Sequence, residues 1–192
     1  MNYAGRVSGR RNEVLGAAVR VLGEQGTRAL THRAVDTAAC LPAGTTSNHF
    51  RTREALISGV LGHLLEQEAA AFAALVGPVA PADADELADR FGAMLRALAG
   101  PSRTLTLARH AIFLEAAHRE SLRRDLLGWS EKLWAWAGEW LAAIGSEQPV
   151  LHARQVLAYA DGLLIDRLAR GGDEEFAPEA SLAALLHALT GR

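Results

Sequence analysis

Two short helices joined by a tight turn are predicted between residues 31 and 54 of the 192-residue chain. Thr31 can accept a hydrogen bond from a free backbone N–H, so we expect it to cap the first of these helices. Pro42 suits the beginning of the second, because its missing N–H is not needed there. The second helix, expected over residues 43–49, carries hydroxyl and amide side chains where a purely structural helix would carry Leu or Ala. Short polar side chains of this kind suit base edges, and the flanking arginines suit phosphates.

The composition favours a helical protein. Apolar residues make up 49% of the chain and charged residues 22%, which is typical of a globular protein. Ala, Leu and Arg are abundant and β-branched residues are few, so the composition is that of a strong helix former. We expect an all-α fold of about nine helices, with an N-terminal three-helix head and a helical body. Besides the two short helices, we expect helices over 10–24, 53–75, 84–99, 103–118, 119–144 and 147–170, and one that starts at Pro178.

Charge is distributed unevenly between these two parts. Residues 1–53 hold eight arginines against three acids, or +5, whereas residues 54–192 hold 12 basic and 19 acidic residues, or −7. A basic N-terminal quarter on an acidic body suggests a nucleic-acid-binding surface at one end. The alternative is that a helical surface is Arg-rich by chance. We place the domain boundary between residues 53 and 54.

Several classes of protein are not expected. The single cysteine, Cys40, excludes an internal disulfide and fits a reducing compartment. No apolar run approaches the roughly 18 residues that a membrane helix needs, and the N-terminus has no apolar segment typical of a secretion signal. We therefore expect a cytoplasmic protein that does not contact a membrane.

Residues 10–60 resemble the DNA-binding head of the tetracycline-repressor (TetR) family. The run ACLPAGTTSNHFRTREAL over 39–56 places the pairs Gly44-Thr45 and His49-Phe50 at the spacing of that family. The segment ADGLL over 160–164 is similar to the penultimate helix of its members. The resemblance implies an all-α homodimeric helix-turn-helix regulator. Its body, residues 54–192, would bind a small-molecule effector, usually releasing DNA, and its last two long helices would form a four-helix dimer interface.

The recognition helix departs from the family pattern at four positions. Cys40 stands where the turn usually has Gly, and Ala43 stands where a basic residue is common. Thr46 replaces a common aliphatic residue, and Ser47 replaces an aromatic that often touches phosphate. The helix is therefore less cationic than usual, so the flanking arginines must supply more of the salt-dependent affinity.

The second helix of a helix-turn-helix enters the major groove of double-stranded DNA. We expect Thr45, Thr46 and Asn48 to read base edges, because Asn pairs with adenine and Thr accepts either a polar edge or a thymine methyl. Thr46 facing the core is the open alternative. Ser47 belongs to the same candidate surface. The candidates for phosphate contacts are Thr31, Arg33, His49, Arg51 and Arg53, although His49 is as suited to packing or capping.

The body carries aromatic and polar residues that suit a small-molecule site. The candidates for contact with the effector are Phe91, Met94, His110, Phe113 and Trp129. The alternative is that these side chains are simply core. His110 has no second His or Cys at i+4, so we expect no metal site. The candidates for dimerisation, on the two closing helices, are Leu157, Leu164, Leu168, Leu182, Leu185 and Leu189.

We thus predict a DNA-binding transcriptional regulator, a ligand-responsive repressor acting as a homodimer on a pseudo-palindromic operator. The alternative is a dimeric helical small-molecule-binding or interaction protein that does not bind DNA. The sequence has no HExxH, no GxSxG and no Gly-rich phosphate loop after a strand, so we expect no enzyme activity and no cofactor.

Overall fold

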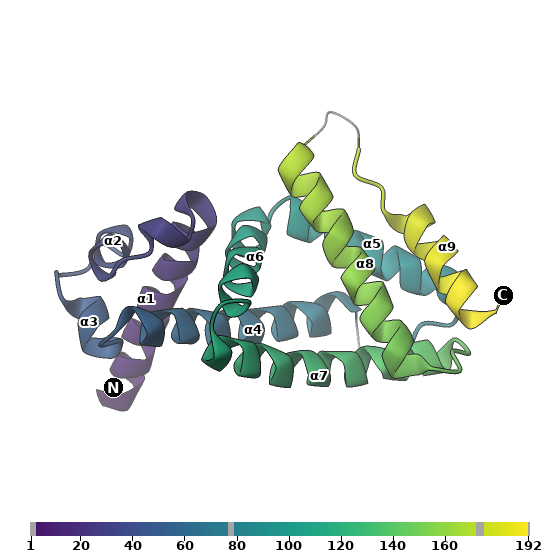
Figure 1. Cartoon of the computed structure of the whole chain (residues 1–192), viewed down its shortest axis with the longest axis horizontal. Helices are drawn as coiled ribbons and strands as arrows, with labels where there is room; N and C mark the ends of the chain where they lie inside the picture. Colours follow the sequence, from purple (N-terminus) through teal and green to yellow (C-terminus); the bar gives the residue numbers. More distant parts are fainter. Residues whose placement is uncertain (1–2, 77–78, 172–174, 192) are drawn as a thin grey trace. The chain divides into compact units, whose positions relative to one another are not determined.

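The computed structural model describes residues 3–76, 79–171 and 175–191, and these residues form nine α-helices with no β-strand. The expected all-α fold is confirmed. The helices, labelled in Figure 1, are α1 (Tyr3–Gln25), α2 (His32–Ala38), α3 (Thr45–His49), α4 (Arg53–Val76), α5 (Ala84–Ala99), α6 (Arg103–Ala116), α7 (Glu120–Ala143), α8 (Pro149–Arg170) and α9 (Glu179–Thr190), with a 3-10 turn, η1 (Thr27–Ala29), after α1.

Local side-chain caps set the beginnings of α2, α4 and α5. The Thr31 hydroxyl accepts a hydrogen bond from the Ala34 N–H at 3.2 Å, which confirms the predicted cap of α2. Thr52 accepts one from Ala55 at 3.0 Å before α4, and Asp83 caps α5 in the same way. The bounds of α5 are those expected, whereas α1 begins before the expected residue 10 and α3 begins after the expected residue 43.

The chain divides into two compact units. We call residues up to Glu68 together with Thr104–Leu126 the head unit, and Ala69–Arg103 together with Leu127–Arg192 the body unit. These units do not coincide with a division at residue 53, because α6 and the first turns of α7 belong with the head. The predicted division into 1–53 and 54–192 is a division by function and stays a prediction.

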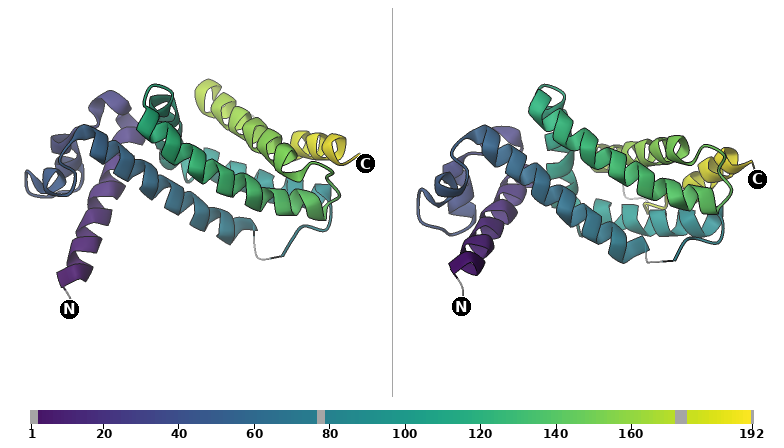
Figure 2. Two further views of the ribbon diagram at one scale, coloured as in Figure 1. Left: turned by 60° about the horizontal axis from the view of Figure 1, so that its bottom comes forward. Right: turned by 90° about the horizontal axis from the view of Figure 1, so that it is seen from below.

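In the head unit, α2 and α3 lie on one side of α1 in each view (Figures 1 and 2). Val14, Leu15 and Leu22 lie on the buried face of α1 and are at most 2% exposed. Gly23 allows a very close approach of α6, because a Cβ there would lie 2.1 Å from the Thr104 carbonyl oxygen. The N-terminus of α6 therefore rests directly on the helix that supports α2 and α3.

In the body unit, α5 packs along α9 and α8 packs against both (Figures 1 and 2). Leu87 and Phe91 of α5 and Leu182 of α9 are at most 2% exposed in its core. The end of α7 adds Trp140 and Leu141 to the same core. In the described part of the chain, no helix is both long and apolar enough to span a bilayer.

Candidate functional site

The turn between α2 and α3 contains an unusual backbone conformation. Cys40 has a φ of 54°, and it is the one non-glycine residue with a positive φ in the described part of the chain. A side chain in this region costs about 1–2 kcal/mol relative to glycine. Gly44, with a φ of 91°, takes the left-handed position at the N-cap of α3, where glycine has no such cost.

Asp36 of α2 holds the N-terminus of α3. One carboxylate oxygen accepts hydrogen bonds from the backbone N–H of Thr46 at 2.7 Å and from the Thr46 hydroxyl at 2.5 Å. The other oxygen accepts one from the Gly44 N–H at 2.8 Å. Gly44 has no side chain with which to cap the helix, so Asp36 supplies the cap from a neighbouring helix.

The same hydrogen bonds set the charge state of Asp36, which is 4% exposed. Its burial raises the pKa of the carboxyl, but the bonds from Thr46 and Gly44, with the nearby His32, outweigh burial and lower the pKa below the ordinary value. Asp36 is therefore a carboxylate at neutral pH and accepts all three bonds.

The structure corrects the expectation for Thr46. Its side chain is 0% exposed, and its hydroxyl donates to Asp36. Thr46 thus has no surface with which to read a base edge. The alternative stated from the sequence, that Thr46 faces the core, is the observed arrangement.

The other candidates for DNA contact lie on or near the surface of α2 and α3. Asn48, Ser47, Arg33 and Thr31 are exposed, although the Thr31 hydroxyl is also the cap of α2. Thr45 and His49 are half-buried.

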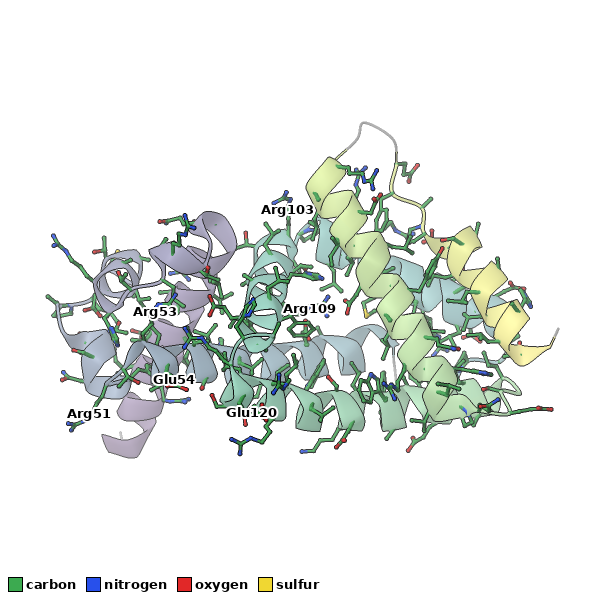
Figure 3. The ribbon with its side chains drawn as sticks, viewed as in Figure 1. Arg51, Arg53, Glu54, Arg103, Arg109 and Glu120 are labelled. Atoms are coloured by element: carbon green, nitrogen blue, oxygen red, sulfur yellow. The ribbon has the colours of Figure 1, made fainter. Side chains whose placement is uncertain are left out.

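The two arginines that follow α3 differ in their surroundings. Arg51 is exposed and its side chain extends away from the ribbon (Figure 3). Arg53 is half-buried, and its guanidinium donates to the Thr27 carbonyl oxygen at 2.7 Å. Arg53 therefore also ties the start of α4 to the turn after α1, whereas Arg51 is oriented toward solvent.

A hollow of about 350 Å³ lies between α2 and α3. It is lined by His32, Arg33, Asp36, Thr37, Leu41, Ala43, Gly44 and Ser47. His32, Asp36 and Thr37 were not among the predicted site residues. A signal for Asp36 exists in the sequence, because it is the only acid between Glu24 and Glu54 in a basic segment.

The predicted effector contacts fall into two groups. Phe91 and Met94 are 2% and 3% exposed in the core of the body unit, and Trp129 of the same unit is half-buried. His110 and Phe113 lie in the head unit with ring centroids 6.4 Å apart. Their joint role in one site stays a prediction.

The head unit contains a buried ion pair beside His110 and Phe113. Arg109 of α6 lies 3.0 Å from the Glu68 carboxylate, and its guanidinium stacks 5.2 Å from the Phe113 ring centroid. His110 Nδ1 lies 2.8 Å from the Thr106 carbonyl oxygen, so that nitrogen carries the hydrogen and donates. The Nε2 lone pair then accepts from Arg109 at 3.3 Å. A neutral His110 satisfies both contacts.

Guanidinium groups also stack on tryptophans of α7. Arg154 lies 4.5 Å from the Trp134 ring centroid, and Arg90 lies 5.9 Å from that of Trp140. Rings of the body unit thus already hold planar cations on their faces. Within residues 3–76, 79–171 and 175–191, no three His, Cys, Asp or Glu side chains are grouped as a metal site requires.

The predicted dimerisation leucines differ in their exposure. Leu164 and Leu182 are 1% and 0% exposed within a single chain, where they form the core of the body unit, so neither has surface to offer a second copy. Leu157, Leu185 and Leu189 pack against that core and are half-buried, as is Leu168. The role of these four leucines in dimerisation stays a prediction.

Comparison with known proteins identifies the family. The family model "Tetracyclin repressor-like, C-terminal domain" matches residues 82–192, which is more than half of the chain. The chain belongs to the tetracycline-repressor (TetR) family. The resemblance stated from residues 10–60 is thereby confirmed by an independent part of the sequence, and TetR proteins are transcription regulators. No curated protein matches the sequence significantly.

Solved structures agree with this assignment. The multidrug binding protein EbrR complexed with ethidium is 31% identical over 94% of this chain and 97% of that chain, with a TM-score of 0.66. A member of the TetR family (SCO1917) from Streptomyces coelicolor A3 is 30% identical over 94% and 98%, with a TM-score of 0.70. A transcriptional regulator from Rhodococcus sp. Rha1 is 21% identical over 93% and 95%, with a TM-score of 0.74, which shows the fold alone.

Replacing Asp36 by Asn should destabilise the protein by about 1–3 kcal/mol at pH 7, because one backbone N–H of α3 loses its charged acceptor. The lowered pKa of Asp36 means that its contribution is fully present above the unfolded value of about 3.9 and is lost as pH falls through the folded value. The difference between wild type and Asp36→Asn should therefore be constant from pH 7 to 5 and shrink below about pH 4.

Urea unfolding followed by circular dichroism measures this difference. Glu13→Gln is the control, because Glu13 is an exposed acid on α1 whose ion pair with Arg10 lies at the surface. Equal stability of wild type and Asp36→Asn at pH 7 would show that the carboxylate does not support α3.

Proposed function

We propose that the protein is a homodimeric, ligand-responsive transcriptional repressor that binds a pseudo-palindromic operator through α3. The observation that carries this proposal is the exposed polar surface of α3, held rigidly by Asp36 and flanked by exposed arginines. Arg33 lies on α2, before α3 in the chain, and Arg51 follows α3. The proposed contacts are Asn48, Thr45 and Ser47 for bases, and Thr31, Arg33, His49, Arg51 and Arg53 for phosphates.

Phosphate contacts determine how strongly such binding depends on salt. Each arginine that neutralises a phosphate releases condensed counterions, so log K falls with log salt by about one more unit per contact. α3 itself carries no Lys or Arg. The arginines around it must therefore supply most of this electrostatic term.

For dimerisation we propose the outer face of α8 and α9 rather than the buried leucines. On α8, Leu151, Tyr159 and Ile165 are 45%, 38% and 51% exposed. Exposed small residues accompany them at helical spacing and allow another helix to approach closely: Ala158, Gly162 and Ala169 on α8, and Ala180, Ala184 and Ala188 on α9. Two copies that pair through this face would form a four-helix interface. Their recognition helices would then contact half-sites about 34–36 Å apart or somewhat further.

The effector that we propose is a planar organic cation bound by the body. EbrR is described as a multidrug binding protein and was crystallised with imidazole, ethidium, malachite green and proflavin, of which the last three are aromatic cations. In the body unit, the rings of Trp134 and Trp140 already accept guanidinium groups on their faces. Phe91, Met94 and Trp129 are the proposed contacts in this unit. His110 and Phe113 of the head unit stay predicted contacts. Such a ligand releases DNA only if it binds the non-DNA-binding conformation more tightly.

Replacing Arg51 by Ala should weaken operator binding and reduce the slope of log K against log salt by about one unit. Fluorescence anisotropy of a labelled operator between about 50 and 200 mM salt measures the slope. Arg124→Ala is the control, since this α7 arginine is 74% exposed but far along the chain from α3. An unchanged slope for Arg51→Ala would remove it from the phosphates, and no binding by wild type would refute the function.

Replacing Ile165 by Glu should convert the dimer into monomers, because a charge would be buried in the proposed interface. The helix content should not change, since Ile165 is exposed in the single chain. Sedimentation velocity measures the oligomeric state. Leu114→Glu on α6 is a matched control, because Leu114 is 72% exposed but lies outside α8 and α9. A dimer that persists in Ile165→Glu would place the interface elsewhere.

Malachite green should quench tryptophan fluorescence and raise the unfolding temperature, because a ligand that binds only the folded state stabilises it. Uncharged leucomalachite green is the matched control ligand. Trp129→Ala should weaken dye binding by about tenfold, the loss of about 1.4 kcal/mol that one aromatic contact can supply. Equal affinity for the charged and uncharged forms would contradict the proposed effector class.

A further inference from the structure

The donor and acceptor roles of the hydroxyl groups on α3 suggest which bases this helix recognises. We propose that Thr45 and Ser47 act toward DNA as hydrogen-bond acceptors and read exocyclic amino groups, those of adenine and cytosine, in the major groove. This inference rests on the proposed DNA-binding function and specifies its sequence preference.

Each hydroxyl group of α3 already donates its hydrogen in a hydrogen bond within the protein. Thr45 donates to the Pro42 carbonyl oxygen at 2.6 Å, and Ser47 donates to the Gly44 carbonyl oxygen at 2.9 Å. Thr46 donates to Asp36. A hydroxyl has one hydrogen and two lone pairs, so each of these oxygens can still accept but has no hydrogen left to give.

Thr45 and Ser47 keep these internal hydrogen bonds when the protein binds DNA, because giving them up would gain no additional hydrogen bond. If Thr45 or Ser47 turned its hydrogen toward a base, it would break an existing hydrogen bond to form a new one. If the oxygen instead accepts from a base, the existing bond stays and a second is added. Acceptance therefore gains a hydrogen bond where donation only exchanges one.

In the major groove, only two groups donate hydrogen bonds: the N6 amino group of adenine and the N4 amino group of cytosine. Guanine presents O6 and N7, and thymine presents O4, all of which are acceptors. A hydroxyl oxygen that can only accept would face these groups lone pair to lone pair. The surface made by Thr45 and Ser47 thus favours adenine or cytosine and disfavours guanine or thymine at the bases it touches.

The surrounding residues complement this polarity. Thr37 lines the same hollow as Ser47, and its hydroxyl also donates its hydrogen within the protein, to the Arg33 carbonyl oxygen at 3.0 Å. The Asp36 carboxylate lines that hollow too and adds negative potential, which favours a donor. Asn48 is exposed and carries both a donor and an acceptor, the pair that adenine N7 and N6 require.

The test begins with the full-length protein and a pool of random duplexes. Selection of bound duplexes should enrich a pseudo-palindrome that has adenine or cytosine at the bases facing α3. Each such adenine is then replaced by purine, which lacks the N6 amino group. Affinity should fall by about tenfold at one or two positions in each half-site. Inosine in place of guanine is the control, since it removes an amino group from the minor groove only.

Two variants connect this loss to the hydroxyls. Thr45→Val keeps the shape of the side chain and Ser47→Ala removes one oxygen from an exposed position. Each should bind the wild-type operator more weakly and should no longer distinguish adenine from purine at its own position. Equal unfolding midpoints show that the variants are folded; if they are not, the purine series on wild type decides alone.

The outcomes separate the two claims. If no duplex is enriched, the proposed DNA-binding function and this inference both fail. The inference is overturned, and the proposed function stands, if the selected operator keeps its affinity when adenine is replaced by purine. The same conclusion follows if the selected operator places guanine or thymine against α3. Full purine sensitivity in both folded variants would also overturn it, because the hydroxyls would then not be the acceptors.

Discussion

The carboxylate of Asp36 is the interaction on which the geometry of α3 depends. A helix of five residues cannot form by itself in water, because nucleation costs more than its few hydrogen bonds return. Asp36 supplies three acceptor contacts at the N-terminus of that helix and fixes its position relative to α2. Because those contacts also turn Thr46 inward, they determine which side chains of α3 remain exposed.

Other polar contacts fasten the remaining short elements of the head unit. Arg20 of α1 donates to the Ala38 carbonyl oxygen at the end of α2, and Arg53 donates to the Thr27 carbonyl oxygen of the 3-10 turn. His32 lies 2.6 Å from the Phe50 carbonyl oxygen at the end of α3. The Ala38 and Phe50 carbonyls lie at helix ends, where intrahelical donors are lacking, whereas the Thr27 carbonyl also accepts from the Leu30 N–H. The short helices are thus held by side chains from their neighbours more than by their own length.

Apolar packing has the corresponding role in the body unit. The leucines of α8 and α9 form one continuous core with α5, and this leaves an outer face of small and apolar residues exposed. A single chain therefore uses both faces of α8, one for its own stability and one for the proposed partner copy. The separation of the two faces explains why a substitution at Leu164 would report on folding, whereas one at Ile165 reports on assembly.

The sequence by itself determined the features that depend on nearby residues. The cap at Thr31 and the bounds of α5 follow from hydrogen bonds and periodicity within a few residues. The family motif over 39–56 likewise depends on local spacing.

Only the tertiary structure decided features that depend on residues distant in the chain. The inward position of Thr46 depends on Asp36, ten residues earlier on another helix. The burial of Leu164 and Leu182 depends on α5. Leucines repeated at helical spacing indicate that a helix has an apolar face. They do not indicate whether that face is covered by the same chain or by another copy. Hydrophobic burial is not directional, so the answer comes from the packing of the whole unit.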